Sequence, residues 1–239
     1  MTNPLRYTWQ LYTGKFEKMF VLMLTTTLPL LMLHSFTTNY IYTITPSLDP
    51  VYSFADIYYA LLTILFYLFA QIPYIRFVYN EYKGNEHSLR NAVYHFLVNG
   101  FTVFLFAVIV SILSAIGFMF FAIPGLILLT LVFPIPYISI FDEKPVWKAF
   151  KEGIRIGKKN FLKIFLIIVI SGTIEGVIGL FVVAQVFNIT DSFAAQILTQ
   201  MTLNLLVFPF VIMYITSCVL KWREELDVLE INEEEATTS

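Results

Sequence analysis

The chain has 239 residues, of which 58% are hydrophobic and only 13% are charged, and its formal net charge is −2. Soluble globular domains have about half of their residues apolar and about a quarter charged. This composition excludes an ordinary soluble domain and indicates an integral membrane protein.

Long runs without charged residues predict the membrane-spanning helices. A bilayer core about 30 Å thick requires roughly 20 apolar residues per helix, and backbone amides that face lipid must be paired within a helix. Six runs meet this requirement: residues 19–40, 57–75, 96–120, 123–141, 164–187 and 197–220. We therefore predict an all-α polytopic membrane domain over residues 1–223, followed by an acidic cytoplasmic tail over residues 224–239 whose end is solvated and mobile.

The Lys and Arg residues predict the orientation of these spans. All 15 fall in the N-terminal segment, in the second and fourth connections and at the start of the tail. Short basic connections remain on the cytoplasmic side of a membrane. We expect a multi-pass protein of the bacterial plasma membrane with both termini in the cytoplasm. No cleaved signal peptide is expected, and the single cysteine, Cys218, is interpreted as a packing residue.

Segments of mixed charge and helical spacing precede three of the spans. They cover residues 5–12, 89–96 and 146–156. In the third, Val146, Trp147, Phe150 and Ile154 can share one face while lysines occupy the other, as is typical of a helix lying in the membrane interface. We predict amphipathic elbow helices and three repeats of elbow plus hairpin. The alternative is that each inner connection is basic and aromatic independently of the others.

The segment from Pro124 to Pro134 has the sequence PGLILLTLVFP, and it is followed by Asp142-Glu143-Lys144 and by Trp147-Lys148-Ala149-Phe150. Over most of its length the chain resembles the YciC-like bacterial inner-membrane proteins and the membrane domain attached to some glycerophosphoryl diester phosphodiesterases. The resemblance implies a six-span membrane module without an assigned catalytic activity. We expect no phosphodiesterase activity, because the chain consists of spans and short connections.

Prolines interrupt several predicted spans, and each removes an amide donor and crowds the preceding turn. We predict helix breaks at Pro29, Pro73, Pro124, Pro134, Pro136 and Pro209. Interrupted helices form binding sites in some transporters. The alternative is that proline is simply common in membrane helices.

Glu175 is the acidic residue that lies well inside a predicted span. Placing a carboxylate near the bilayer centre costs about 2.5 to 3.5 kcal/mol even on the gentler insertion scales. Small and polar residues share its helical face, so we predict that another helix approaches closely there. These residues are Ser171, Gly172, Gly176 and Gly179.

Candidate partners for Glu175 are Gln71, Asn99, Gln200 and Asn204. Glu175 could couple binding of a substrate or cation to movement. It could instead be a neutral carboxyl group that is hydrogen-bonded across a helix interface.

The fourth connection and the start of the fifth span are strongly basic. Their cationic residues are Lys144, Lys148, Lys151, Arg155, Lys158, Lys159 and Lys163. Each such charge near a membrane surface attracts anionic lipid by about 1 kcal/mol, so we predict contact with anionic phospholipids. The alternative is that these charges only set the orientation of the chain.

No catalytic or metal-binding motif is found in the sequence. His34, His87 and His95 are too dispersed to predict a ligand cluster and are interpreted as interfacial residues. We expect no enzymatic activity, no cofactor, no metal site and no binding of nucleic acid. The prediction is a membrane accessory module that binds lipids, a membrane-protein partner or a second copy of itself. The alternative is a small transporter or exporter component, including one that protects the cell against a membrane-active peptide.

Overall fold

The computed structural model describes residues 3–46, 53–120 and 122–238, with the side chains at 99, 122 and 227–238 outside this description. All elements in these ranges are helical, which confirms the predicted all-α class. They are α1 (Pro4–Gly14), α2 (Phe16–Leu22), the π-helical turn η1 (Met23–Thr27), α3 (Leu28–Ile44), α4 (Phe54–Ala70), α5 (Ile72–Tyr82), α6 (Ser88–Met119), α7 (Ala122–Val132), α8 (Pro134–Phe141), α9 (Val146–Lys159), α10 (Phe161–Phe187) and α11 (Phe193–Thr238).

Six helical segments of the described chain are long and apolar enough to cross a membrane. They are Phe16–Ile44, Phe54–Tyr82, Gly100–Met119, Ile123–Phe141, Phe161–Phe187 and Phe193–Leu226. Each coincides with one of the six predicted runs. The protein is therefore a multi-pass helical membrane protein.

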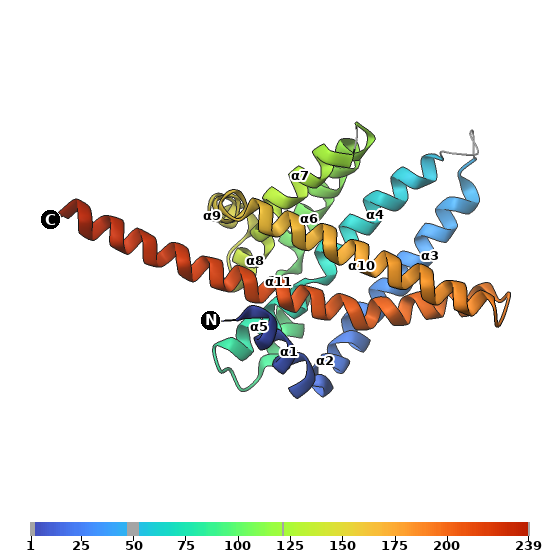
Figure 1. Ribbon diagram of the computed structural model, residues 1–239, viewed down its shortest axis with the longest axis horizontal. Helices are drawn as coiled ribbons and strands as arrows, with labels where there is room; N and C mark the ends of the chain where they lie inside the picture. Colours follow the sequence, from blue (N-terminus) through green and yellow to red (C-terminus); the bar gives the residue numbers. More distant parts are fainter. Residues whose placement is uncertain (1–2, 47–52, 121, 239) are drawn as a thin grey trace.

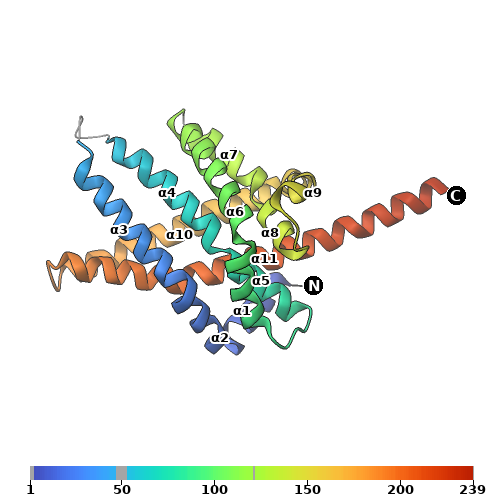
Figure 2. The same cartoon turned by 180° about the vertical axis from the view of Figure 1, so that it is seen from behind.

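The spans form three helical hairpins, of which α3/α4 and α6/α7 point in a similar direction and α10/α11 points in another (Figures 1 and 2). The tips of α3/α4 and α6/α7 lie along the top of Figure 1, whereas the α10/α11 tip lies at the far right. In the views from the front and from behind, the α3/α4 pair crosses the α10/α11 pair (Figures 1 and 2). The opposite end of α11 projects away from the bundle.

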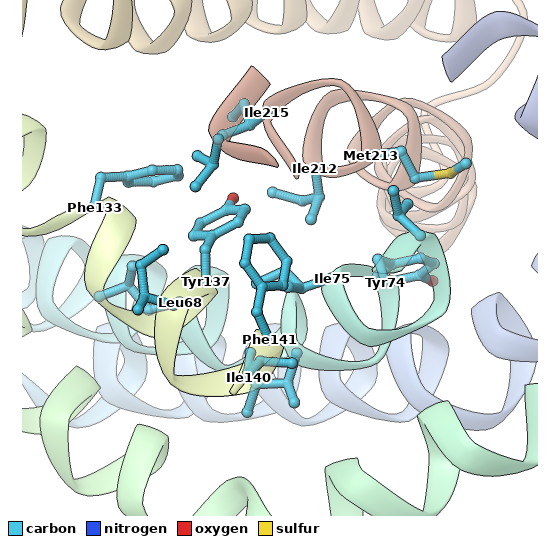
Figure 3. Packing of buried hydrophobic residues seen from close by; sticks show 14 of the residues in the cluster. Leu68, Tyr74, Ile75, Phe133, Tyr137, Ile140, Phe141, Ile212, Met213 and Ile215 are labelled. Atoms are coloured by element: carbon cyan, nitrogen blue, oxygen red, sulfur yellow. The ribbon is translucent and has the colours of Figure 1, made fainter. Parts of the chain in front are cut away.

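The packed core lies where α5, α8 and the middle of α11 meet, away from the hairpin tips. Tyr74, Tyr137 and Ile212 are completely buried there. Figure 3 shows these side chains facing one another across the three helices. Because lipid is as apolar as these residues, close van der Waals packing must supply the attraction between the helices. By contrast, only 6% of the apolar window of α10 is buried.

Three prolines occur where helical segments meet. Pro29 lies in the first turn of α3, directly after η1. Pro73 lies in the first turn of α5, and a single residue separates α5 from the end of α4 at Ala70. Pro134 begins α8, and Phe133 separates it from α7. A missing amide donor disrupts the regular hydrogen-bond ladder, and the local widening to a π-helical turn before Pro29 has this cause.

The other prolines lie inside helices. Pro124 is within the first turn of α7, and Pro136 is within α8. Pro209 is in the interior of α11, and the helix runs without interruption from Phe193 to Thr238. The predicted break at Pro209 is therefore wrong. In a long membrane helix, neighbouring groups and small adjustments of geometry can satisfy the carbonyl that proline leaves unpaired.

Two of the three predicted elbow helices are separate elements. They are α1 and α9, each of which ends one residue before a span begins. Residues 89–96 instead form the first part of α6, which continues into the third span without a break. No proline or glycine lies between Ser88 and Asn99, so nothing local ends the helix there.

The acidic segment forms the last part of α11. The backbone of residues 224–238 continues α11, which is 46 residues long. This segment contains neither proline nor glycine and is rich in Glu, a good helix former.

Candidate functional site

A cavity of about 520 Å³ lies between the α3/α4 hairpin and the α10/α11 hairpin. Most of its wall is apolar, and the polar groups come from all four helices. The polar and titratable lining residues are Thr27, His34, Tyr59, Thr63, Tyr67, Glu175, Gln200 and Asn204. Because the two hairpins cross (Figure 1), their side chains do not fill the space between them.

Glu175 projects from the middle of α10 toward this cavity. It also lines a smaller cavity of about 180 Å³, which is bounded in part by Ser171, Thr63 and Tyr67. Its carboxyl group makes no hydrogen bond or ion pair with any described side chain or backbone group. Glu175 therefore lies between two cavities.

The fold places the candidate partners of Glu175 in different parts of the molecule. Gln200 and Asn204 line the same cavity, and the Gln200 amide donates a 3.1 Å hydrogen bond to the Asn204 carbonyl oxygen. Gln71 lies elsewhere in the core, where its Oε1 accepts a 2.9 Å hydrogen bond from the Tyr137 hydroxyl. The side chain of Asn99 lies outside the described residues.

The small-residue face of α10 forms a cavity wall. A Cβ atom built on Gly172 or Gly176 would have no contact with another described helix within 4 Å. A Cβ on Gly179 would lie 3.2 Å from Oε1 of Gln200 on α11. Close helix packing is therefore found at Gly179 but not at Gly172 or Gly176, where the prediction is wrong. The hairpins diverge at these positions, and the sequence of one helix cannot show this.

His34 is a cavity residue that the sequence interpretation missed. Its Nε2 atom lies 3.1 Å from the Thr63 hydroxyl, so one side of the ring is hydrogen-bonded. Its ring also packs against Tyr59 and Phe66, with centroids 5.8 and 5.5 Å away. A histidine inside an apolar span could have identified His34 as a candidate. Because His34 and Glu175 are far apart in the sequence, the sequence did not show that they line the same cavity.

The basic helix α9 presents three different faces. Val146, Ala149 and Ile156 are buried against the bundle. Trp147 and Phe150 are 51% and 45% exposed. The predicted grouping of Val146 with these aromatic residues is therefore wrong. Lysines form the third face, at helical spacing along the exposed side: Lys148, Lys151, Lys158 and Lys159.

The basic residues of α9 and its flanks differ in their partners. Lys148, Lys151, Lys158 and Lys159 are exposed and form no ion pair with a described residue, and Arg155 is also exposed. Lys144 bonds to Asp142 at 2.7 Å and to Glu152 at 3.0 Å. Lys163 donates a 3.3 Å hydrogen bond to Asn160 and lies 6.0 Å from the Trp222 ring.

Two glycines allow α9 to pack directly on the break between α7 and α8. A Cβ atom on Gly153 would lie 2.6 Å from a side-chain carbon of Ile135. A Cβ on Gly157 would lie 2.3 Å from the carbonyl oxygen of Leu131. Both separations are impossible for real atoms, so α9 can hold this position only with glycine at both places.

The turn between α8 and α9 is fixed by ion pairs to two other helices. Asp142 accepts hydrogen bonds of 2.7 and 2.9 Å from the Arg223 guanidinium of α11. Glu143, with a left-handed φ of 52°, pairs with the buried Arg76 of α5. His95 of α6 lies 3.5 Å from the same carboxylate. Burial, together with nearby Arg76, lowers the pKa of His95 despite the opposing effect of Glu143.

Among the described residues, no group of three or more His, Cys, Asp or Glu side chains is arranged to hold a metal ion. Comparison with known proteins gives no further assignment: no family model, no curated protein and no solved structure matches this chain.

Proposed function

We propose that the protein is a non-enzymatic accessory module of the bacterial plasma membrane that binds anionic phospholipids through α9. The observation that carries this proposal is the division of α9 into a buried face, an exposed aromatic face and an exposed lysine face. Trp and Phe favour the depth of the lipid headgroups, while lysines favour the charged surface above them.

The orientation belongs to the same proposal. The basic connections and both termini would lie in the cytoplasm, where the leaflet is rich in anionic lipid. The four lysines that form no ion pair with a described residue would then face that leaflet. At about 1 kcal/mol for each charge near the surface, they would enrich anionic lipid around α9.

Native mass spectrometry of the protein in nanodiscs tests this proposal. Nanodiscs made from equal amounts of phosphatidylcholine and phosphatidylglycerol would show which lipid is retained on the protein after release. The test variant replaces Lys148, Lys151, Lys158 and Lys159 with Gln. The matched control replaces Arg6, Lys15, Lys83 and Arg90 with Gln, which removes the same charge from exposed residues outside α9.

The wild type and the control variant should retain phosphatidylglycerol preferentially, and the α9 variant should lose this preference. The preference of the wild type should also weaken as salt concentration rises, because salt screens surface charge. Equal loss in both variants would contradict a specific role of α9. Co-purification of a stoichiometric protein in place of lipid would favour a partner-binding module.

The cavity favours a second candidate function, a small transporter or exporter component, including one that protects the cell against a membrane-active peptide. A cavity that contains polar groups between two hairpins within the spans is a feature that transport requires. Flux of a bound solute across proteoliposomes that contain the wild type, and its absence with Glu175→Gln, would support this function.

A further inference from the structure

We propose that the cavity between α3, α4, α10 and α11 binds an apolar organic cation, with the Glu175 carboxylate as its counter-ion. The proposal concerns binding alone. It does not depend on lipid contact at α9, and it names a ligand class for the second candidate function without requiring transport.

The first argument is the size and the lining of the cavity. Its volume of about 520 Å³ is within the range of roughly 300–1,000 Å³ that is common for small-molecule sites. Leu30, Leu31, Leu180 and Val183 contribute apolar surface, with Phe66 nearby. A hydrated inorganic ion would leave this surface without a complementary partner, whereas an organic ion would cover it.

The second argument is the charge of the site. No Lys or Arg lines the cavity in the part of the chain that the structure describes. The imidazole of His34, on the opposite wall, is engaged with Thr63 and forms no ion pair with Glu175. An ionised Glu175 therefore lacks a cationic partner among the described residues. A carboxylate in apolar surroundings is costly unless it is paired, so a cation in the cavity would be stabilised strongly.

The third argument is the arrangement of aromatic rings. Tyr59, Phe66, Tyr67 and Phe208 all line the cavity. The faces of aromatic rings attract cations, by about 2 kcal/mol when the ion is desolvated. The rings would hold the apolar groups of the ligand while the carboxylate selects its charge.

The walls also leave space beside the carboxylate. Gly176 follows Glu175 in α10, and a Cβ atom added there would have no contact within 4 Å with other described helices. The amide pair of Gln200 and Asn204 lies on the facing helix and supplies polar groups without charge. A ligand can therefore approach Glu175 along α10 without displacing another helix.

Two ions of the same shape and opposite charge test this inference. Tetraphenylphosphonium and tetraphenylborate differ in the sign of their charge, and empty nanodiscs correct for their partition into lipid. Equilibrium binding to the protein in phosphatidylcholine nanodiscs should be saturable for the phosphonium and absent for the borate. Glu175→Gln preserves the size of the side chain and should weaken phosphonium binding by about tenfold or more.

Two further variants separate loss of binding from loss of folding. Gly176→Leu should fill the cavity and reduce phosphonium binding while the carboxylate remains, and its unfolding midpoint should stay close to that of the wild type. Glu225→Gln removes an exposed carboxylate near the other end of α11 and should leave binding unchanged.

Wild-type protein that binds neither ion, or both ions equally, would overturn the inference. So would a Glu175→Gln variant that binds the phosphonium as well as the wild type does. Saturable binding without any flux across proteoliposomes would support the cavity as a binding site while contradicting the transporter as a function. Loss of lipid selectivity in the α9 variant has no bearing on this result.

Discussion

Single glycine residues determine how closely α9 approaches the spans. At Gly157 the nearest obstacle to a side chain is the backbone carbonyl of Leu131, which cannot rotate away. Gly176 also lies in a helix, but its surroundings are open. Replacing glycine with alanine at each position therefore tests the same substitution in a closely packed and in an open environment.

Gly157→Ala should lower the free energy of unfolding by about 2–3 kcal/mol, because overpacking forces α9 away from α7. Gly176→Ala should be neutral or should raise it by about 0.5–1 kcal/mol, because alanine loses less backbone entropy than glycine in a helix. Titration of each variant in mild detergent with dodecyl sulfate, followed by circular dichroism, measures both changes. Equal midpoints for the two variants would show that α9 does not hold the close packing described.

At the scale of the secondary-structure elements, an ion pair between Asp142 and Arg223 connects the turn between α8 and α9 to α11. Burial by itself raises the pKa of Asp142, but hydrogen bonds and charge from Arg223 and Lys144 have the larger combined effect, so its pKa falls below the ordinary value of 3.8. The folded state therefore holds the Asp142 proton less tightly than the unfolded state does. Its contribution to stability is present above pH 3.8 and is lost as pH falls through the lower pKa of the folded state.

Asp142→Asn should reduce stability by about 1 kcal/mol at neutral pH, because a bidentate, charge-assisted pair is removed at a partly exposed position. The difference between variant and wild type should shrink as pH is lowered below 3.8. Dodecyl sulfate unfolding midpoints across this pH range measure it. The exposed Asp191→Asn is the control and should behave as the wild type throughout. A difference independent of pH would exclude the ion pair as its cause.

At the scale of the whole molecule, the threading of the six spans can be tested through the single native cysteine. Cys218 is buried, so an impermeant maleimide should react slowly with it, and Cys218→Ser removes this background. In that background, Asp191→Cys should be labelled from outside intact cells. Lys148→Cys should be labelled only after the membrane is opened. The reverse pattern would invert the proposed orientation, and labelling of both from outside would reject the six-span arrangement.

The sequence predicts most of the fold because apolar run length is a local property. The span at residues 123–141 has the same bounds in the structure, and the segment predicted at residues 146–156 lies within the separate helix α9. Features that depend on the packing of several helices are harder to predict from the sequence. Pro209 does not break α11, and the buried side of α9 is determined by Leu131 and Ile135 rather than by its own periodicity.

The candidate site was predictable only in part for the same reason. A carboxylate inside a span identifies Glu175 from the sequence alone, since its cost in lipid is high. Two of its candidate partners, Gln200 and Asn204, line the same cavity but are hydrogen-bonded to each other. His34 and the aromatic wall were not predicted, because their position opposite α10 results from the crossing of two hairpins that are far apart in the sequence: α4 ends at Ala70 and α10 begins at Phe161.

The length of α11 has a consequence for the distribution of charge. Its 46 residues would extend about 69 Å at 1.5 Å per residue, more than twice the thickness of a bilayer core. The helix therefore acts as a rod that carries the acidic end of the chain away from α9 (Figure 2). A net charge of only −2 conceals a separation of opposite charges, in which distance and screening prevent the acidic rod from neutralising the lysines of α9.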